Sequence, residues 1–251
     1  MTIELSINGQ TVAIRDGASV LDAINQSGTY LSQLCKDPDM KPLGACRTCL
    51  VQIDGQRGFP ASCSIPASDG MTIWTNTPEV TEVRKGVIEL TLGMLPQNQD
   101  KNYEELSLAA AHHNISTPLW NGRSREPTDN SNPIFEIAMD SCILCGRCAK
   151  ACQDGAQFIG AIDVLGTGTN SRIGTFMDRP LIESVCTTCG QCLSVCPTGA
   201  IEVKEASGSP NKSVTTTCPY CGVGCGIKAQ VDDTDRIIEM LDDPDNQSSV
   251  G

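Results

Sequence analysis

The first 80 residues alternate between apolar and polar positions in short segments, which is the pattern of half-buried strands. Two such segments, TIELSI and TVAI, flank Asn8-Gly9, a pair that accepts the positive φ angles of a two-residue hairpin turn. Ser19 and Asp22 suit the cap of the short helix that follows. LVQIDG and MTIWT are further strand-like segments. We therefore expect a small mixed sheet with one helix across it, the β-grasp arrangement.

The middle of the chain changes to helical periodicity. Residues 77–95 and 103–113 place apolar side chains three and four positions apart. Residues 121–132, NGRSREPTDNSN, are polar and typical of a linker or surface loop. Beyond them come apolar segments of strand length: IFEIAMDSC, AQFIGAIDVLG, TFMDRPLIES and PTGAIEVKE. GSPNKS has the composition of a linker, and VDDTDRIIEMLDDPDN predicts a strand, a turn and a strand.

Composition changes the picture from one core to several small ones. Hydrophobic residues make up 39% of the 251 residues and aromatic residues only 4%, while cysteine occurs 15 times. Because the chain starts directly with strand-like alternation, without a signal peptide, the cysteines favour metal sites over disulfides and we expect a cytoplasmic protein. The net charge of −12 argues against nucleic acid or an anionic membrane as partner. No apolar run is long enough to span a bilayer.

Eight cysteines form two runs, CILCGRCAKAC at 142–152 and CTTCGQCLSVCP at 186–197. Each run is C-x2-C-x2-C-x3-C and resembles a bacterial two-cluster ferredoxin, in which the fourth cysteine of each run ligates the other cluster. The resemblance implies one [4Fe-4S] cluster on Cys142, Cys145, Cys148 and Cys196, and a second on Cys186, Cys189, Cys192 and Cys152. Two structural zinc sites are the alternative, although such sites normally use C-x2-C pairs or mixed Cys/His ligands.

The N-terminal cysteines are spaced as Cys35-x10-Cys46-x2-Cys49-x13-Cys63. This spacing resembles the [2Fe-2S] domain that begins the large iron–sulfur subunit of respiratory complex I, iron-only hydrogenases and NAD-linked formate dehydrogenases. The resemblance implies that the four thiolates hold a [2Fe-2S] cluster, with Gly44 letting the backbone approach it. Arg47, between two of the ligands, is expected to be a solvated surface residue. A zinc site in this loop is the alternative.

The same families normally carry a further cluster motif in the next interval, with one histidine followed by three cysteines. Here Leu95 stands where the histidine would be, and Gln99 and Tyr103 fall near expected cysteine positions. We infer that this cluster is absent and its helices are kept, so electrons either pass directly from the first cluster to the next or enter from a partner subunit. His112 and His113 are expected at the surface or as helix caps rather than as ligands.

A third kind of cysteine group lies near the C-terminus, at Cys218-x2-Cys221-x3-Cys225. It resembles the first [4Fe-4S] motif of molybdenum or tungsten bis-pterin oxidoreductases, above all formate dehydrogenases and assimilatory nitrate reductases. The resemblance implies a fourth cysteine beyond Gly251, and hence the N-terminal part of a larger catalytic subunit. The alternatives are a short electron-transfer subunit, and three thiols that hold an incomplete cluster or zinc.

Together these features predict an α+β chain in four parts. They are a [2Fe-2S] β-grasp domain at 1–80, a helical segment with a degenerate histidine–cysteine cluster site at 81–132, a two-[4Fe-4S] ferredoxin-like domain at 133–205, and the beginning of a molybdopterin oxidoreductase [4Fe-4S] domain at 206–251.

The resemblances imply electron transfer through one [2Fe-2S] cluster, two [4Fe-4S] clusters and a third [4Fe-4S] cluster if the chain continues. Electrons would pass between a molybdenum or tungsten bis-pterin site that oxidises formate to CO2 and a flavin/NAD-binding iron–sulfur subunit, with a ferredoxin as a second candidate partner. None of the residues present is expected to be catalytic. The alternative is the iron–sulfur subunit of an NAD-reducing nickel–iron hydrogenase, against which the CPYCGVGC motif argues.

Overall fold

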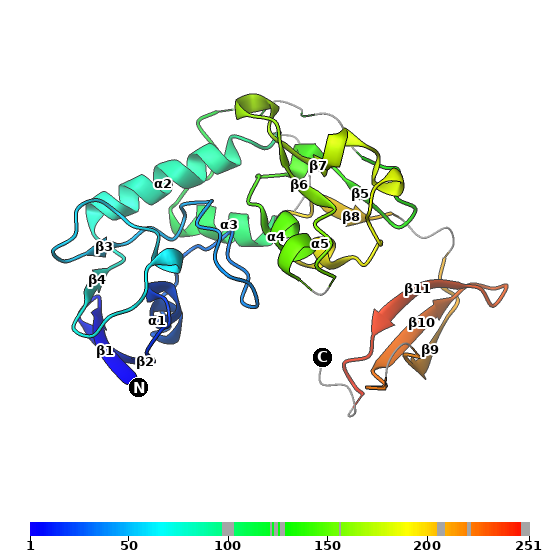
Figure 1. Ribbon diagram of the computed structural model, residues 1–251, viewed down its shortest axis with the longest axis horizontal. Helices are drawn as coiled ribbons and strands as arrows, with labels where there is room; N and C mark the ends of the chain where they lie inside the picture. The colour runs from blue at the N-terminus through cyan, green and yellow to red at the C-terminus, as the bar shows by residue number, and fades with distance from the viewer. Residues whose placement is uncertain are drawn as a thin grey trace. The chain divides into compact units, whose positions relative to one another are not determined.

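The computed structural model describes residues 1–96, 103–120, 122, 125, 129–155, 157–204, 209–219 and 222–246. The chain forms two compact units, Met1–Val203 and Lys204–Gly251. Figure 1 shows the helices and strands of both units.

A four-stranded mixed sheet begins the first unit, in the order β2 (Gln10–Arg15), β1 (Thr2–Ile7), β4 (Thr72–Trp74) and β3 (Gln52–Ile53). β1 and β2 form the predicted hairpin, with φ of 51° at Asn8 and 87° at Gly9. The helix α1 (Val20–Gln26) packs its apolar face on this sheet, and Ser19 and Asp22 form the predicted capping box. The expected β-grasp arrangement is confirmed.

Two helices follow the sheet, as predicted: α2 (Pro78–Leu92) and α3 (Glu104–His112). Arg84 of α2 is only 3% exposed, and its guanidinium donates to the carbonyl oxygens of Leu50 (3.1 Å) and Thr75 (2.5 Å). These two bonds tie α2 to the N-terminal sheet. Within the described ranges, no helix is long and apolar enough to cross a membrane.

The remainder of the first unit is built from paired short elements: α4 (Arg147–Asp154) and α5 (Gln191–Ser194), β5 (Phe135–Ile137) paired with β8 (Ile201–Val203), and β6 (Ile162–Leu165) paired with β7 (Arg172–Thr175). Both strand pairs are antiparallel. Each helix starts after a left-handed glycine inside a cysteine run, Gly146 (φ 78°) or Gly190 (φ 76°). The two cysteine runs therefore have matching backbone turns.

The strand expected at residues 175–184 is wrong beyond its first residue. Met177 and Asp178 have φ of 58° and 57°, which an extended strand does not tolerate. Two 3-10 turns, Phe176–Asp178 and Leu181–Glu183, replace the strand. β7 therefore ends at Thr175.

The second unit contains a three-stranded antiparallel sheet in the order β11 (Ile237–Asp242), β10 (Gly226–Val231) and β9 (Lys212–Thr217). The turn and β11 were predicted, but β10 lies before the segment in which the first strand was expected and shares only Val231 with it. β9 was not predicted, because its side chains are polar or exposed on both faces and give no periodic signal. Lys228 forms ion pairs with the buried Asp243 (2.9 Å) and with Asp245 (3.2 Å), which tie β10 to the residues after β11.

Among the described residues of the first unit, buried apolar side chains gather in three clusters, of which the second connects its two halves. This second cluster combines Ile88 of α2 and Leu106 of α3 with side chains from two cysteine loops. Figure 1 accordingly shows α2 and α3 between the N-terminal sheet and the α4–α5 pair. The retained helices thus pack the two halves of the unit together.

Replacing Arg84 with methionine should lower the free energy of unfolding by about 2–3 kcal/mol, because two buried carbonyl oxygens lose a charged donor. Urea unfolding of the anaerobically purified protein measures the loss. Lys85→Met, on the same helix, is the matched control and should change stability little. Equal losses in both variants would contradict the anchoring role of Arg84.

His113, the residue that caps the C-terminus of α3, is buried. Burial, followed by the charges of Arg84, His112 and Lys85, lowers the pKa of His113 from 6.5 to about 4. The unfolded chain takes up this proton below pH 6.5 and the folded chain does not until about pH 4. The stability that the neutral form contributes is therefore complete above pH 6.5 and is lost as the pH falls toward 4.

His113→Gln should accordingly make the free energy of unfolding less pH-dependent across this interval. The difference between wild type and variant removes any acid sensitivity that both proteins share. His112→Gln, at an exposed position, removes one of the lesser causes of the shift and should reduce the pH dependence much less than His113→Gln does. An unaltered slope in the His113 variant would refute the assignment.

Candidate metal centres

The four N-terminal cysteines come together from three segments: the loop after α1, the 43–49 loop and a 3-10 turn at Ser62–Ser64. Their side chains form two hydrogen-bonded pairs, Cys35 with Cys46 and Cys49 with Cys63. The chain thus brings all four predicted thiols into one place, although 28 positions separate the first from the last in a loop-rich stretch.

Polar groups of these loops point at the sulfur atoms. The Thr48 hydroxyl lies 3.2 Å from the Cys46 sulfur, and the Ser64 hydroxyl lies 3.4 Å from the Cys63 sulfur. The backbone N–H of Gly44 also donates to the Cys63 sulfur. A Cβ atom at Gly44 would lie 2.9 Å from the Ser64 hydroxyl, so this close approach requires glycine. Such donors stabilise thiolates and tune an iron–sulfur group.

The ionisation of these thiols is uneven. A hydrogen bond from Cys46 lowers the pKa of Cys35 to about 6, and one from Cys49 lowers the pKa of Cys63 to about 6. The donors keep their protons, since these same bonds, followed by burial, raise the pKa of Cys46 and of Cys49. Four thiolates in one buried place need a compensating cation. The donor set therefore fits a cationic iron–sulfur group.

The two cysteine runs have the same internal hydrogen bonds. Leu144 N–H donates to Cys142 (3.3 Å), and Thr188 N–H donates to Cys186 (3.4 Å). Leu144 and Thr188 share a positive φ, at 54° and 58°. At the fourth cysteines, Cys152 accepts from Ala161 N–H at 3.1 Å and Cys196 accepts from Ala200 N–H at 3.2 Å. In both runs, therefore, a backbone N–H donates to the first cysteine and another donates to the fourth.

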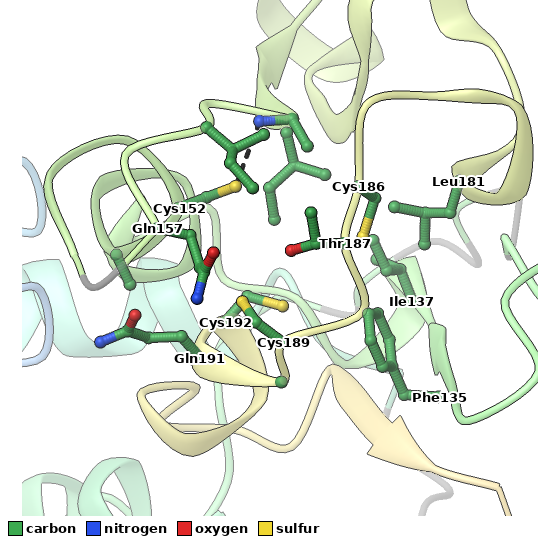
Figure 2. A pocket seen from close by; sticks show the side chains of 15 residues that line it. Phe135, Ile137, Cys152, Gln157, Leu181, Cys186, Thr187, Cys189, Gln191 and Cys192 are labelled. Carbon is green, nitrogen blue, oxygen red and sulfur yellow. Dashed lines mark hydrogen bonds between the residues drawn. The ribbon is translucent and has the colours of Figure 1, made fainter. Parts of the chain in front are cut away.

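Each fourth cysteine lies with the other run. One cavity is lined by Cys142, Cys145 and Cys148 together with Cys196. A second cavity, shown in Figure 2, is lined by Cys186, Cys189 and Cys192 together with Cys152. These are the two sets that crossed ligation requires. Among the described residues, no group of three or more Cys, His, Asp or Glu side chains is arranged to hold a single metal ion.

Burial is the main cause of the raised thiol pKa values in both cavity-lining sets of cysteines. Burial, followed by the charges of Cys142 and Cys196, raises the pKa of Cys145 to about 12. Burial likewise raises the pKa of Cys192 to about 12, with added repulsion from Cys152, Cys186 and Cys189. In both cases the repelling thiols belong to the same cavity. Bound iron supplies the positive charge that such buried thiolates need.

Cys218 and Cys225 lie at the connection between β9 and β10. Cys218 N–H donates to the carbonyl oxygen of Cys225 at 2.8 Å, which places these two residues opposite each other at the end of the hairpin. Cys221 lies outside the described residues.

Other residues singled out from the sequence are also placed. Arg47 is exposed, as expected. His112 is exposed and His113 caps α3, so both fit the expected surface or capping position, although His113 is buried. Leu95 and Tyr103 are buried in the second apolar cluster, while Gln99 lies outside the described residues.

Arg147 was not predicted as a site residue. Its buried guanidinium contacts groups beyond its own cysteine run. The only sequence signal was its place in CGRC, where the second run has CGQC.

Three domain models match the chain. The 2Fe-2S iron-sulfur cluster binding domain matches residues 1–78, the ferredoxin-like domain of NADH-quinone oxidoreductase subunit 3 matches residues 132–202, and the molybdopterin oxidoreductase Fe4S4 domain matches residues 211–251. The predicted fold class is thereby confirmed: the chain contains [2Fe-2S] and [4Fe-4S] cluster domains in the expected order.

Two similar curated proteins are named as subunits of NADP(H)-linked oxidoreductases. The NADP-reducing hydrogenase subunit HndD of Solidesulfovibrio fructosivorans is 32% identical over 84% of this chain and 39% of its own length. The alpha subunit of an NADPH-Fe(3+) oxidoreductase of Geobacter sulfurreducens is 29% identical over 90% of this chain and 27% of its own length. The chain thus spans well under half the length of these relatives.

A solved structure covers most of the same region. One chain of an NAD+-reducing [NiFe]-hydrogenase in the H2-reduced state superposes with a TM-score of 0.73 and 25% identity. The match covers 84% of this chain and 92% of that one. Most of this chain therefore shares its fold with one chain of that hydrogenase.

Crossed ligation predicts which iron is lost when one fourth cysteine is removed. Cys196→Ala should damage the cluster held by Cys142, Cys145 and Cys148, and Cys152→Ala should damage the other one. EPR spectra of the reduced variants distinguish the two losses. If Cys196→Ala removed only the signal of the cluster at Cys186, crossed ligation would be wrong.

Proposed function

We propose that this chain carries electrons between a bis-pterin molybdenum or tungsten site that oxidises formate to CO2 and a flavin/NAD-binding iron–sulfur subunit. The observation that carries the proposal is the order of its domains. A [2Fe-2S] domain and a ferredoxin-like domain of the NADH-quinone oxidoreductase type precede a molybdopterin oxidoreductase Fe4S4 domain in one chain. This order joins the region expected beside NAD chemistry to the region expected beside pterin chemistry.

The residues proposed as ligands fall into four sets. One [2Fe-2S] group would be held by Cys35, Cys46, Cys49 and Cys63, and two [4Fe-4S] groups by the two cavity-lining sets. A third [4Fe-4S] group would be held by Cys218, Cys221 and Cys225 with a fourth ligand from further residues. When bound, such groups accept and release single electrons. The chain's own part is to supply thiolates, direct N–H and hydroxyl donors at sulfur, and exclude water.

The fold favours direct exchange between the first two sites, in place of the missing histidine–cysteine cluster. Cys35 and Cys145 belong to one buried apolar cluster, and Cys46 packs against it. Leu34 and Ile143, close to these cysteines in sequence, are buried in the same cluster. The proposed [2Fe-2S] site and the proposed site of the first run are thus neighbours through packed side chains.

The proposed partner is a flavin/NAD-binding iron–sulfur subunit, and a ferredoxin is the second candidate. Fifteen cysteines that serve as metal ligands would suit a reducing compartment, so we also propose a cytoplasmic location. We further propose the domain limits 1–80, 81–132, 133–205 and 206–251.

A second candidate is the iron–sulfur subunit of an NAD-reducing hydrogenase. The match to the [NiFe]-hydrogenase structure, which covers 92% of that chain, favours it. The segment that matches the molybdopterin oxidoreductase domain at 211–251 favours the formate proposal.

Metal and pterin analysis of the native complex separates the two candidates. The formate proposal predicts molybdenum or tungsten with pterin, together with NAD+ reduction that depends on formate. Nickel without either metal, and NAD+ reduction by H2 but not by formate, would reject it in favour of the hydrogenase.

A further inference from the structure

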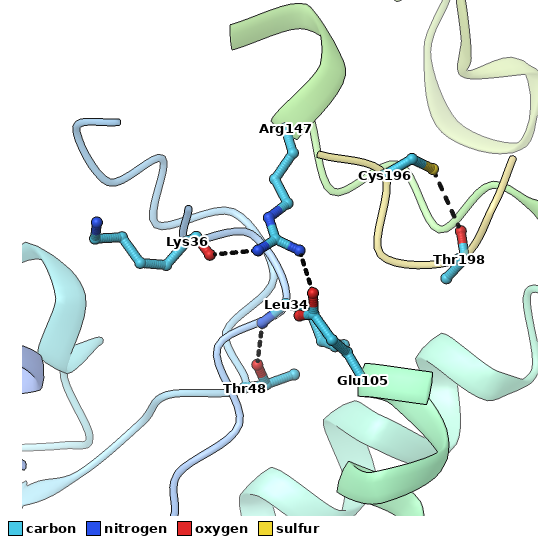
Figure 3. Close-up of polar contacts among 7 residues, drawn as sticks. All are labelled: Leu34, Lys36, Thr48, Glu105, Arg147, Cys196 and Thr198. Carbon is cyan, nitrogen blue, oxygen red and sulfur yellow. Dashed lines mark hydrogen bonds and ion pairs between the residues drawn. The ribbon is translucent and has the colours of Figure 1, made fainter. Parts of the chain in front are cut away.

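Arg147 joins three segments that are far apart in sequence. Its guanidinium donates to the Glu105 carboxylate of α3 at 2.7 Å and to the backbone carbonyl of Lys36 at 2.8 Å (Figure 3). The Arg147 side chain is 8% exposed, whereas that of Glu105 is 44% exposed. A planar guanidinium makes both bonds at once, which an ammonium group cannot match in geometry.

These contacts connect the backbones of two proposed ligand loops. Lys36 directly follows Cys35 of the N-terminal set, and Arg147 lies between Cys145 and Cys148 of the first run. The turn that follows Lys36 is itself braced, because the Lys36 ammonium group donates to the carbonyl oxygens of Pro38 (3.3 Å) and Met40 (3.1 Å). The bond from Arg147 therefore ends directly before a braced turn of the [2Fe-2S] loop.

The second cysteine run provides an internal comparison. Gln191 occupies the position of Arg147, after Gly190 with the same left-handed backbone as Gly146. The C-x2-C-x2-C loop is thus built with either residue at this position. The arginine occurs in the run whose loop contacts the N-terminal thiol loop. We therefore attribute the arginine to this contact, because a ligand loop of the same kind forms without it.

The burial of Arg147 is costly in itself. Its Nε finds no hydrogen-bond partner within the described part of the chain. A buried guanidinium that leaves a donor unpaired is disfavoured unless its other bonds are needed. Those other bonds are the ones that cross from the first run to α3 and to the Lys36 loop.

We propose that Arg147 is a positioning residue that holds the Cys35 loop against the Cys145–Cys148 loop, with Glu105 of α3 as its support. It thereby sets the distance and magnetic contact between the [2Fe-2S] site and the first [4Fe-4S] site. The helix α3, which carries Glu105, thereby supports the contact between the two loops. The inference rests on the proposed cluster ligation.

The test compares Arg147→Gln, Arg147→Lys and Glu105→Gln in the full complex. Arg147→Gln gives the first run the same residue as the second, so clusters should assemble and iron content should equal wild type. EPR of the reduced complex then reports how strongly the neighbouring [4Fe-4S] cluster speeds the spin relaxation of the [2Fe-2S] signal. This enhancement should be lost in both Arg147 variants and weakened in Glu105→Gln.

A redox titration distinguishes the effect of Arg147 on the position of the loops from the effect of its charge on the cluster potential. Arg147→Gln should shift the potential of the first [4Fe-4S] cluster to more negative values, because a nearby positive charge is removed. Arg147→Lys keeps the charge and should largely keep the potential while losing the relaxation enhancement. Arg47→Gln, at the exposed arginine between two ligands of the other loop, is the matched control and should preserve the enhancement.

Unchanged relaxation in both Arg147 variants with full iron content would overturn the inference. Loss of iron from either site would also overturn it, since Arg147 would then be needed for assembly rather than for position. If the wild-type complex itself lacked both EPR signals, the proposed cluster ligation would fail instead.

Discussion

Buried thiols that must ionise together are the constraint on which this structure depends. Burial raises the pKa of the cysteines in both cavities of the ferredoxin-like part, and neighbouring thiols of the same set raise it further. Around the N-terminal site, two thiols lose their protons only because their partners keep theirs. A cation removes this conflict, and its binding energy then becomes part of the folding energy. This suits a chain with few aromatic residues and three modest apolar clusters.

The second apolar cluster connects the N-terminal thiol site to the site of the first cysteine run. It contains cysteines from the N-terminal thiol loop and from the first run, packed with side chains of α2 and α3. The helices α2 and α3, expected as the scaffold of an absent cluster, therefore pack these two sites together. Arg147 adds a directional bond to this packing, with a carbonyl 111 positions away as its acceptor.

Local patterns in the sequence were enough to predict the elements that depend on neighbouring residues. The Asn8-Gly9 hairpin, the Ser19 cap and the helices α2 and α3 are examples. The crossed grouping of thiols came from resemblance to ferredoxins, because spacing alone does not say where the fourth cysteine goes. The segment after Thr175 was mistaken for a strand because its left-handed residues, Met177 and Asp178, leave no mark in an apolar pattern. The burial of His113 and the contacts of Arg147 depend on residues distant in sequence, and periodicity does not report such contacts.

The most direct test of the central claim is Mössbauer spectroscopy of the anaerobically purified protein, combined with iron, sulfide and zinc analysis. The account predicts separate two-iron and four-iron components, labile sulfide in proportion to iron, and little zinc. A protein that holds zinc at its cysteines, with little iron and no labile sulfide, would contradict it.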